Sequence, residues 1–133
     1  MQQNNFKYPK EERLKSKIAI EKMFTEGKSV SKYPLRLVFI PMKNKYELPI
    51  QMGVSVSKRY FKHAVDRNYY KRLLREAYRL NKSLLLEELD QDYAIMFFYQ
   101  TKERLTFDEI QIKTVKLFEK FNTFIKSQQA DTI

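Results

Sequence analysis

Basic side chains are concentrated between Ser57 and Lys82, and their types and spacing suit the binding of phosphate groups. This segment carries nine cations but only two carboxylates, so about one fifth of the 133 residues holds seven of the formal net charge of +10. Arg dominates, and its planar guanidinium group pairs with phosphate oxygens and stacks on bases. The nine cations are Lys58, Arg59, Lys62, Arg67, Lys71, Arg72, Arg75, Arg79 and Lys82.

Helical spacing separates these cations from the apolar residues around them. With about 3.6 residues per turn, a helix over Asp66 to Leu80 brings the basic residues onto one face, because they follow one another at intervals of four. The basic face holds Arg67, Lys71, Arg75 and Arg79, with Asn68 and Arg72 beside them; the opposite face holds Tyr70, Leu73, Leu74 and Ala77.

A solvated face crossed by salt bridges is the ordinary interpretation of a charged stripe, but it needs carboxylates that are missing here. Guanidinium groups within a Debye length of ~8 to 10 Å repel one another unless an anion neutralises them. The helix is therefore expected to bind phosphate groups. Tyr60, Phe61 and Tyr69 could stack on bases, whereas Tyr70 faces the core; Tyr60 and Phe61 could equally anchor the preceding loop.

The composition argues against a protein active site. There is no Cys, so disulfides, thiolate zinc sites and Cys nucleophiles are excluded. The two glycines, Gly27 and Gly53, are too far apart for a phosphate-binding loop, and a single His cannot build a metal site. His63 is interpreted as a surface or phosphate-contacting residue. Asp90 and Asp92 are interpreted as turn residues before a strand, and no metal site is expected.

The partner is expected to be nucleic acid rather than a membrane. The apolar runs are far shorter than the ~20 residues of a membrane span, and Met1 to Lys10 lacks the features of a secretory signal, so a cytoplasmic location is expected. Large apolar residues do not flank the basic face as they would in a membrane-lying helix. DNA is disfavoured because strands, not a helix-turn-helix pair, precede the basic helix.

The remaining pattern predicts one α+β domain over residues 1–133, with a core at about 13–125 and polar tails. The expected fold is a two-layer sandwich, in which helices pack on a mixed sheet of about four strands in the order α-β-β-β-α-(α)-β-α. Apolar residues on both faces of the Asp92 to Tyr99 strand place it in the middle of the sheet. The other expected elements are a helix at 16–26 ended by a left-handed Gly27, strands at 35–40 and 50–57, a short helix at 83–89, and a long helix that begins at a Thr106 to Glu109 capping box.

The residues from Arg67 to Glu76 also carry a resemblance to a known family. They follow the pattern R-N-x-x-K-R-x-x-R-E, which is similar to the signature of the bacterial ribonuclease P protein component. The preceding Val54 to Arg59 and the early Arg13-Leu14, Met23-Phe24 and Gly27-Lys28-Ser29 resemble the same family. The similarity runs from about Arg13 to Phe124 in the same order of elements.

This resemblance implies a small basic subunit of a ribonucleoprotein endonuclease that removes the 5′ leader from precursor tRNA. In that family the RNA subunit carries the chemistry, and Mg²⁺ is held mainly by the RNA and the substrate. The implied partners are ribonuclease P RNA and precursor tRNA, with no membrane and no required protein partner. The implied leader cleft, between the first helix and the sheet, contains Ile20, Phe24 and Arg36. Together, the resemblance and the basic residues between Ser57 and Lys82 lead us to expect nine RNA contacts: Lys58, Arg59, Lys62, Arg67, Asn68, Lys71, Arg72, Arg75 and Arg79.

One alternative remains open on the sequence. A general RNA-binding or ribosome-assembly module could use the same basic helix and sheet without any link to cleavage.

Overall fold

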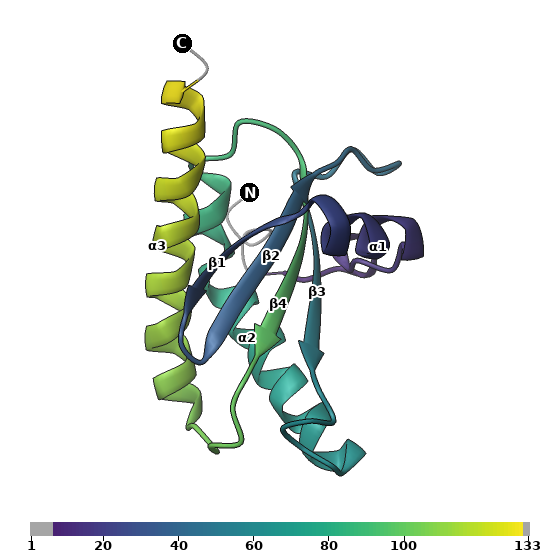
Figure 1. The fold of residues 1–133 in the computed structure, drawn as a ribbon, viewed down its shortest axis with the longest axis vertical. Helices are drawn as coiled ribbons and strands as arrows, with labels where there is room; N and C mark the ends of the chain where they lie inside the picture. The colour runs from purple at the N-terminus through teal and green to yellow at the C-terminus, as the bar shows by residue number, and fades with distance from the viewer. Residues whose placement is uncertain (1–6, 132–133) are drawn as a thin grey trace.

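The computed structural model describes residues 7–131, and its helices and strands alternate as the α+β prediction requires (Figure 1). A short 3-10 helix precedes the first α-helix, and three strands follow before the basic helix. In chain order the elements are η2 (Lys10–Glu12), α1 (Lys17–Glu26), β1 (Lys28–Lys32), β2 (Leu35–Pro41), β3 (Ile50–Val56), α2 (Ala64–Leu86), β4 (Tyr93–Tyr99) and α3 (Phe107–Asp131).

The sheet is mixed because one of its pairings is parallel. The strand order is β1-β2-β4-β3, with β1·β2 and β2·β4 antiparallel and β3·β4 parallel. Phe97 of β4 pairs with Leu37 on one side and with Val54 on the other. The central position predicted for this strand is confirmed, and α2 is the long connection that a parallel pair needs.

The two faces of the sheet are covered differently. Leu37, Met52 and Phe97 point to the face on which α2 and α3 pack, and all three are fully buried there. On the other face, α1 lies across one end of the sheet and packs Ala19 and Met23 against strand residues (Figure 1). The rest of that face has no helix over it among the described elements, and we call it the open face. The predicted α+β fold is confirmed.

Two local predictions are wrong. The expected short helix at 83–89 is the last part of α2, which continues through Leu80 and Ser83 because no Gly or Pro interrupts it. Gly27 does end α1, but with φ −69° and ψ 156° rather than in the left-handed conformation. A side chain is excluded there because a Cβ would lie 2.3 Å from the carbonyl oxygen of Met23.

The segment before α1 is fixed along the outer edge of β3. The amide of Leu14 donates to the carbonyl of Met52 (3.0 Å), and the Gln51 side chain donates to the carbonyl of Glu11 (2.9 Å). Below this segment, Lys82 of α2 forms a buried ion pair with Glu12 at 2.8 Å. Glu12 also accepts a hydrogen bond from the Tyr78 hydroxyl, so α2 holds the N-terminal segment in place.

The predicted capping box at the start of α3 is confirmed. The Thr106 hydroxyl accepts from the amide of Glu109 (3.2 Å), and the Glu109 carboxylate accepts from the amide of Thr106 (2.8 Å). Among residues 7–131, no helix is long and apolar enough to cross a membrane.

Candidate nucleic-acid interface

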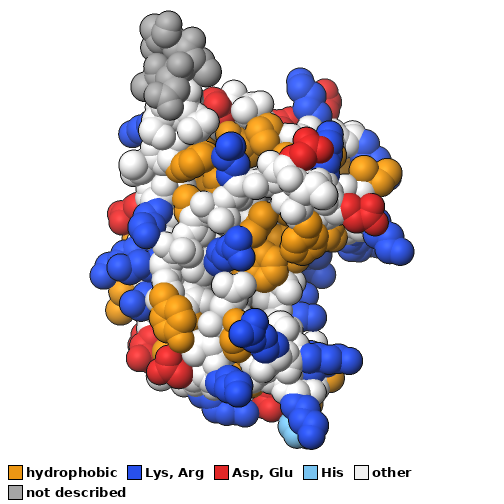
Figure 2. All heavy atoms as spheres, in the orientation of Figure 1, with side chains coloured by type: hydrophobic (Ala, Val, Ile, Leu, Met, Phe, Trp, Pro, Cys, Tyr) orange, Lys and Arg blue, Asp and Glu red, His pale blue; other side chains and the backbone are white. Residues whose placement is uncertain are grey.

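The apolar side of α2 is anchored in the core, which fixes the direction of its basic side. Tyr70, Leu74 and Ala77 are buried, as the helical spacing predicts. Arg72 is exposed, and Lys71 and Arg75 are half-buried along the opposite side of the helix. Figure 2 shows Lys and Arg side chains gathered at the end of the molecule where α2 begins.

Both carboxylates of the basic segment are already engaged. Asp66 pairs with Arg104 at 3.3 Å, and Glu76 pairs with Arg79 at 2.6 Å. The hydrogen bond from Arg79 is the main reason why the pKa of Glu76 is lowered. No salt bridge joins the other cations of α2's exposed side to a carboxylate within the described part of the chain. We call these four cations the basic stripe: Arg67, Lys71, Arg72 and Arg75.

Arg67 has a structural duty besides its charge. Its guanidinium group donates to the carbonyls of Phe61 (3.0 Å) and Lys62 (2.8 Å), which fixes the loop before α2. Phe61 is buried and stacks on Tyr70 with ring centroids 4.7 Å apart. Of the two roles considered for Phe61, stacking on a base or anchoring the loop, the structure therefore shows the second. The loop leaves Lys58, Arg59, Lys62 and His63 exposed at the start of the helix, next to the exposed Asn68.

Two tyrosine rings, one exposed and one half-buried, lie under guanidinium groups in the same region. Arg72 lies over the Tyr69 ring and Arg59 over the Tyr60 ring, each 5.7 Å from the ring centroid. Tyr69 is 45% exposed, so one face of an aromatic ring is available beside the stripe.

Lys82 lies apart from the cations with which the sequence grouped it. It is only 5% exposed, and its ammonium group donates to Glu12 and to the carbonyl of Lys7 (2.5 Å). Lys82 is therefore not part of the basic surface, although it belongs to the same basic segment of the sequence. Helical position alone gave no signal of this, because the partner carboxylate lies 70 residues away in the sequence.

The open face lies beside α1 and combines apolar and basic side chains. Ile20 packs with Met96 and Phe98 at the edge of the small core under α1, while Phe24, one turn later, is 70% exposed. Arg36 is half-buried on the same face, and its guanidinium group donates to the Ser29 hydroxyl at 3.4 Å. Of the three residues expected to line a cleft, Ile20 and Phe24 thus lie on the first helix and Arg36 lies on the open face of the sheet. In Figure 2 a hydrophobic patch lies next to α1 with Lys and Arg near it.

The described side chains form no metal-binding cluster: no three His, Asp or Glu among them gather closely enough to hold a metal ion. Asp90 accepts a hydrogen bond from the Tyr93 hydroxyl at 3.0 Å, which fits its predicted place in the turn before the strand. The arrangement is suited to binding phosphates and bases.

Comparison with known proteins shows the family of this chain. A sequence model of the family described as Ribonuclease P matches residues 8–122. The chain belongs to this family. The ribonuclease P protein component of Porphyromonas gingivalis is 43% identical over 102 residues, which cover 75% of this chain and 74% of that protein. That of Dictyoglomus turgidum is 34% identical over 113 residues, covering 85% and 91%.

Solved structures agree with this assignment. The ribonuclease P protein of Thermotoga maritima, solved in complex with 1-(4-fluorophenyl)-2-thiourea, is 27% identical and superposes with a TM-score of 0.63, covering 80% of this chain and 96% of that one. The Staphylococcus aureus protein shares the fold, with a TM-score of 0.64 at 24% identity over 80% and 92% of the two chains. Membership of the ribonuclease P protein family gives the chain a role in tRNA processing, as a component of an endoribonuclease that includes RNA.

One part of the surface has no counterpart in the sequence predictions. Arg13 lies over the ring of Tyr8, 5.2 Å from its centroid, and the Tyr8 hydroxyl donates to the carbonyl of Met52. Burial raises the pKa of Tyr8 to about 12, against the opposing effect of Arg75 and Arg13. Tyr8 therefore belongs to the N-terminal segment and packs its ring against Tyr78 of α2. No local pattern signals this, because the contact with β3 spans 44 residues.

Proposed function

We propose that this chain binds the catalytic RNA of ribonuclease P through the basic stripe of α2 and holds the 5′ leader of precursor tRNA on the open face. The expected contacts around the stripe are those at the start of α2, namely Lys58, Arg59, Lys62 and Asn68, with Arg79 at its far end. Ile20, Phe24 and Arg36 are the residues proposed for the leader.

The unneutralised stripe is the observation that carries this proposal. Four cations on one rigid helix repel one another in the free protein, and phosphates that replace the missing carboxylates relieve this repulsion. Arg67 and Lys71 are one helical turn apart, as are Lys71 and Arg75, so the stripe presents a regular row of donors.

The proposed contribution to cleavage is electrostatic. Cations from the protein offset the repulsion between the phosphates of the catalytic RNA and those of the precursor, so the complex needs less free Mg²⁺.

Cleavage at limiting Mg²⁺ tests this role. A leader-bearing precursor tRNA is incubated with a bacterial ribonuclease P RNA, with and without the protein, and we expect wild type to restore cleavage where an Arg67→Ala/Arg75→Ala variant and an unrelated basic protein do not. Failure of the wild type with its native partner RNA, while tight RNA binding persists, would favour the general RNA-binding module.

Phe24→Ala tests the leader site separately. Phe24 is highly exposed and contributes little to the core, so the fold should be unchanged. Loss of a ring that stacks on a base costs ~1–3 kcal/mol, so affinity for leader-bearing precursor should fall about fivefold or more while affinity for mature tRNA is kept. Equal losses on both RNAs, measured with the assembled holoenzyme, would contradict the leader assignment.

A further inference from the structure

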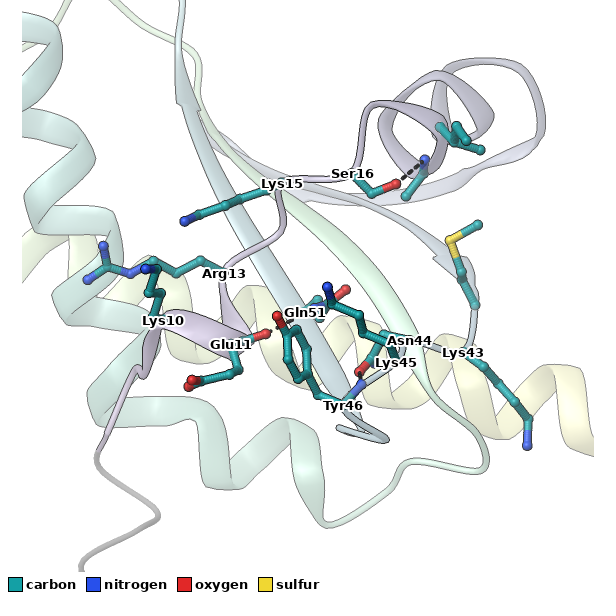
Figure 3. Close-up of a pocket in the computed structure, with 13 residues that line it drawn as sticks. Lys10, Glu11, Arg13, Lys15, Ser16, Lys43, Asn44, Lys45, Tyr46 and Gln51 are labelled. Carbon is teal, nitrogen blue, oxygen red and sulfur yellow. Dashed lines mark hydrogen bonds between the residues drawn. The ribbon is translucent and has the colours of Figure 1, made fainter.

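A pocket rich in lysine and arginine lies on the other side of α1 from the open face. Its volume is about 690 Å³, and it is enclosed by the N-terminal segment, the start of α1 and the loop between β2 and β3. Figure 3 shows Lys10, Arg13 and Lys15 on one side of this pocket, with Lys43, Lys45 and Tyr46 on the other.

The pocket is separate from the proposed leader site. Gln51, Gly53 and Ser55 share one face of β3. Leu14 lies over Gly53, because a Cβ added to this glycine would be 3.5 Å from the Cβ of Leu14. Gln51 lines the pocket on one side of this contact, while Ser55 pairs with Phe98 on the open face beyond it.

Charge in the pocket is strongly one-sided. Its lining includes five cations, Lys10, Arg13, Lys15, Lys43 and Lys45, but Glu11 is the one carboxylate among its lining residues. No salt bridge neutralises any of these cations within residues 7–131. The site should therefore attract anions, as the basic stripe does.

An aromatic ring is presented at the rim in a fixed loop. The Asn44 side chain accepts from the amides of Tyr46 and Leu48, each at 3.1 Å, and donates to the carbonyl of Leu48 at 2.8 Å. Tyr46 is 46% exposed, and the Lys45 ammonium group lies 5.2 Å from the centroid of its ring. A partly exposed ring beside lysines suits an unpaired nucleotide, whose base stacks while its phosphate meets the cations.

The pocket continues the basic stripe rather than the leader site. Arg13 lines the pocket and also lies over Tyr8, whose ring packs against that of Tyr78 on α2, three residues after Arg75. The pocket is therefore joined to α2 through Tyr8, whereas the packing of Leu14 and α1 on the sheet blocks the direct way from the open face.

We propose that this pocket binds an unpaired segment of the same catalytic RNA that contacts the basic stripe. Lys43 and Lys45 meet its phosphates, and Tyr46 stacks on one of its bases. The inference rests on the proposed function, since it takes the RNA partner of α2 as given.

Binding of the catalytic RNA alone, measured over a range of salt concentrations, tests the pocket. Lys43→Ala/Lys45→Ala should lower the log–log salt slope by ~0.7 for each single-strand phosphate that these lysines no longer neutralise, and Tyr46→Ala should weaken binding by about fivefold or more. Lys43→Arg/Lys45→Arg should retain the wild-type slope.

Lys113→Ala/Lys116→Ala is the matched control. It removes the same charge from α3 and should leave binding unchanged. For the pocket variants, the preference of the holoenzyme for leader-bearing over mature tRNA should not change.

Two results would overturn the proposal. One is wild-type affinity and slope in both pocket variants; the other is a loss confined to leader-bearing precursor, which would assign the pocket to the leader. A Lys71→Ala/Arg75→Ala variant in the same titration distinguishes failure of the pocket assignment from failure of the proposed role of α2. If it loses affinity while the pocket variants keep theirs, the pocket assignment alone fails. If it also keeps full affinity, the proposed function of α2 fails.

Discussion

Replacing Lys71, Arg72 and Arg75 together with alanine is expected to weaken binding of the catalytic RNA by about 1,000-fold or more at physiological salt. Hydrogen bonds to charged groups contribute ~1.5–3 kcal/mol each, and the variant removes three such donors. None of the three is held by a described salt bridge in the free protein, so no existing ion pair is lost with them. The salt slope should fall by about 2 to 3, at ~0.7–0.9 for each phosphate contact. Filter binding or fluorescence titration at several salt concentrations measures both quantities.

A matched variant separates this effect from the loss of net charge. Lys102→Ala/Lys113→Ala/Lys116→Ala removes three cations from outside the stripe and should change affinity little. The stripe variant should unfold at a urea concentration no lower than wild type at low salt, because it removes repulsion between neighbouring cations. Wild-type affinity and slope in the stripe variant would mean that α2 does not face the RNA.

Lys82→Met is expected to lower the free energy of unfolding by ~3–5 kcal/mol, a large effect for a single substitution. Met keeps the length of the side chain but leaves the Glu12 carboxylate buried without its cation. Glu12 retains the hydrogen bond from Tyr78, whose own pKa is raised chiefly by burial and then by Glu12. Urea unfolding followed by circular dichroism gives the change.

The double variant Glu12→Gln/Lys82→Met provides the control. With both charges removed, no buried charge stays unpaired, so the double variant should be more stable than Lys82→Met alone. Breaking the exposed pair by Lys126→Ala should cost less than ~1 kcal/mol. If Lys82→Met costs no more than Lys126→Ala, the buried pair does not hold the N-terminal segment on α2.

Local patterns were enough to predict the elements that carry the proposed site. The segregation of cations from Tyr70, Leu74 and Ala77 is a property of one helix, so the sequence alone predicts which side of α2 is exposed. The two-sided apolar pattern of β4 likewise predicts its central place, because strands lie on both sides of it, α2 and α3 cover one face and α1 packs on part of the other.

Features that depend on distant residues were not predictable in this way. Lys82 follows the basic segment in sequence but is buried, because Glu12 reaches it from the N-terminal segment. Tyr8 and the cations of the pocket are assembled by the hydrogen bonds of residues 8–14 to β3. The β1 strand, with Lys and Ser around Val30, has no apolar alternation that would mark it.

The N-terminal segment that runs along β3 also determines how copies of this chain can meet. The two outer strands of the sheet are β1 and β3, and an uncovered outer strand is a template for pairing with another chain. β1 carries Lys28 and Lys32 at its ends, and lysines at an edge discourage such pairing. β3 has no lysine, and instead the bridge from Arg13 to Met52 occupies its edge. A chain shortened to begin after Leu14 would present that backbone to its neighbours, so we expect it to aggregate more readily than the full chain.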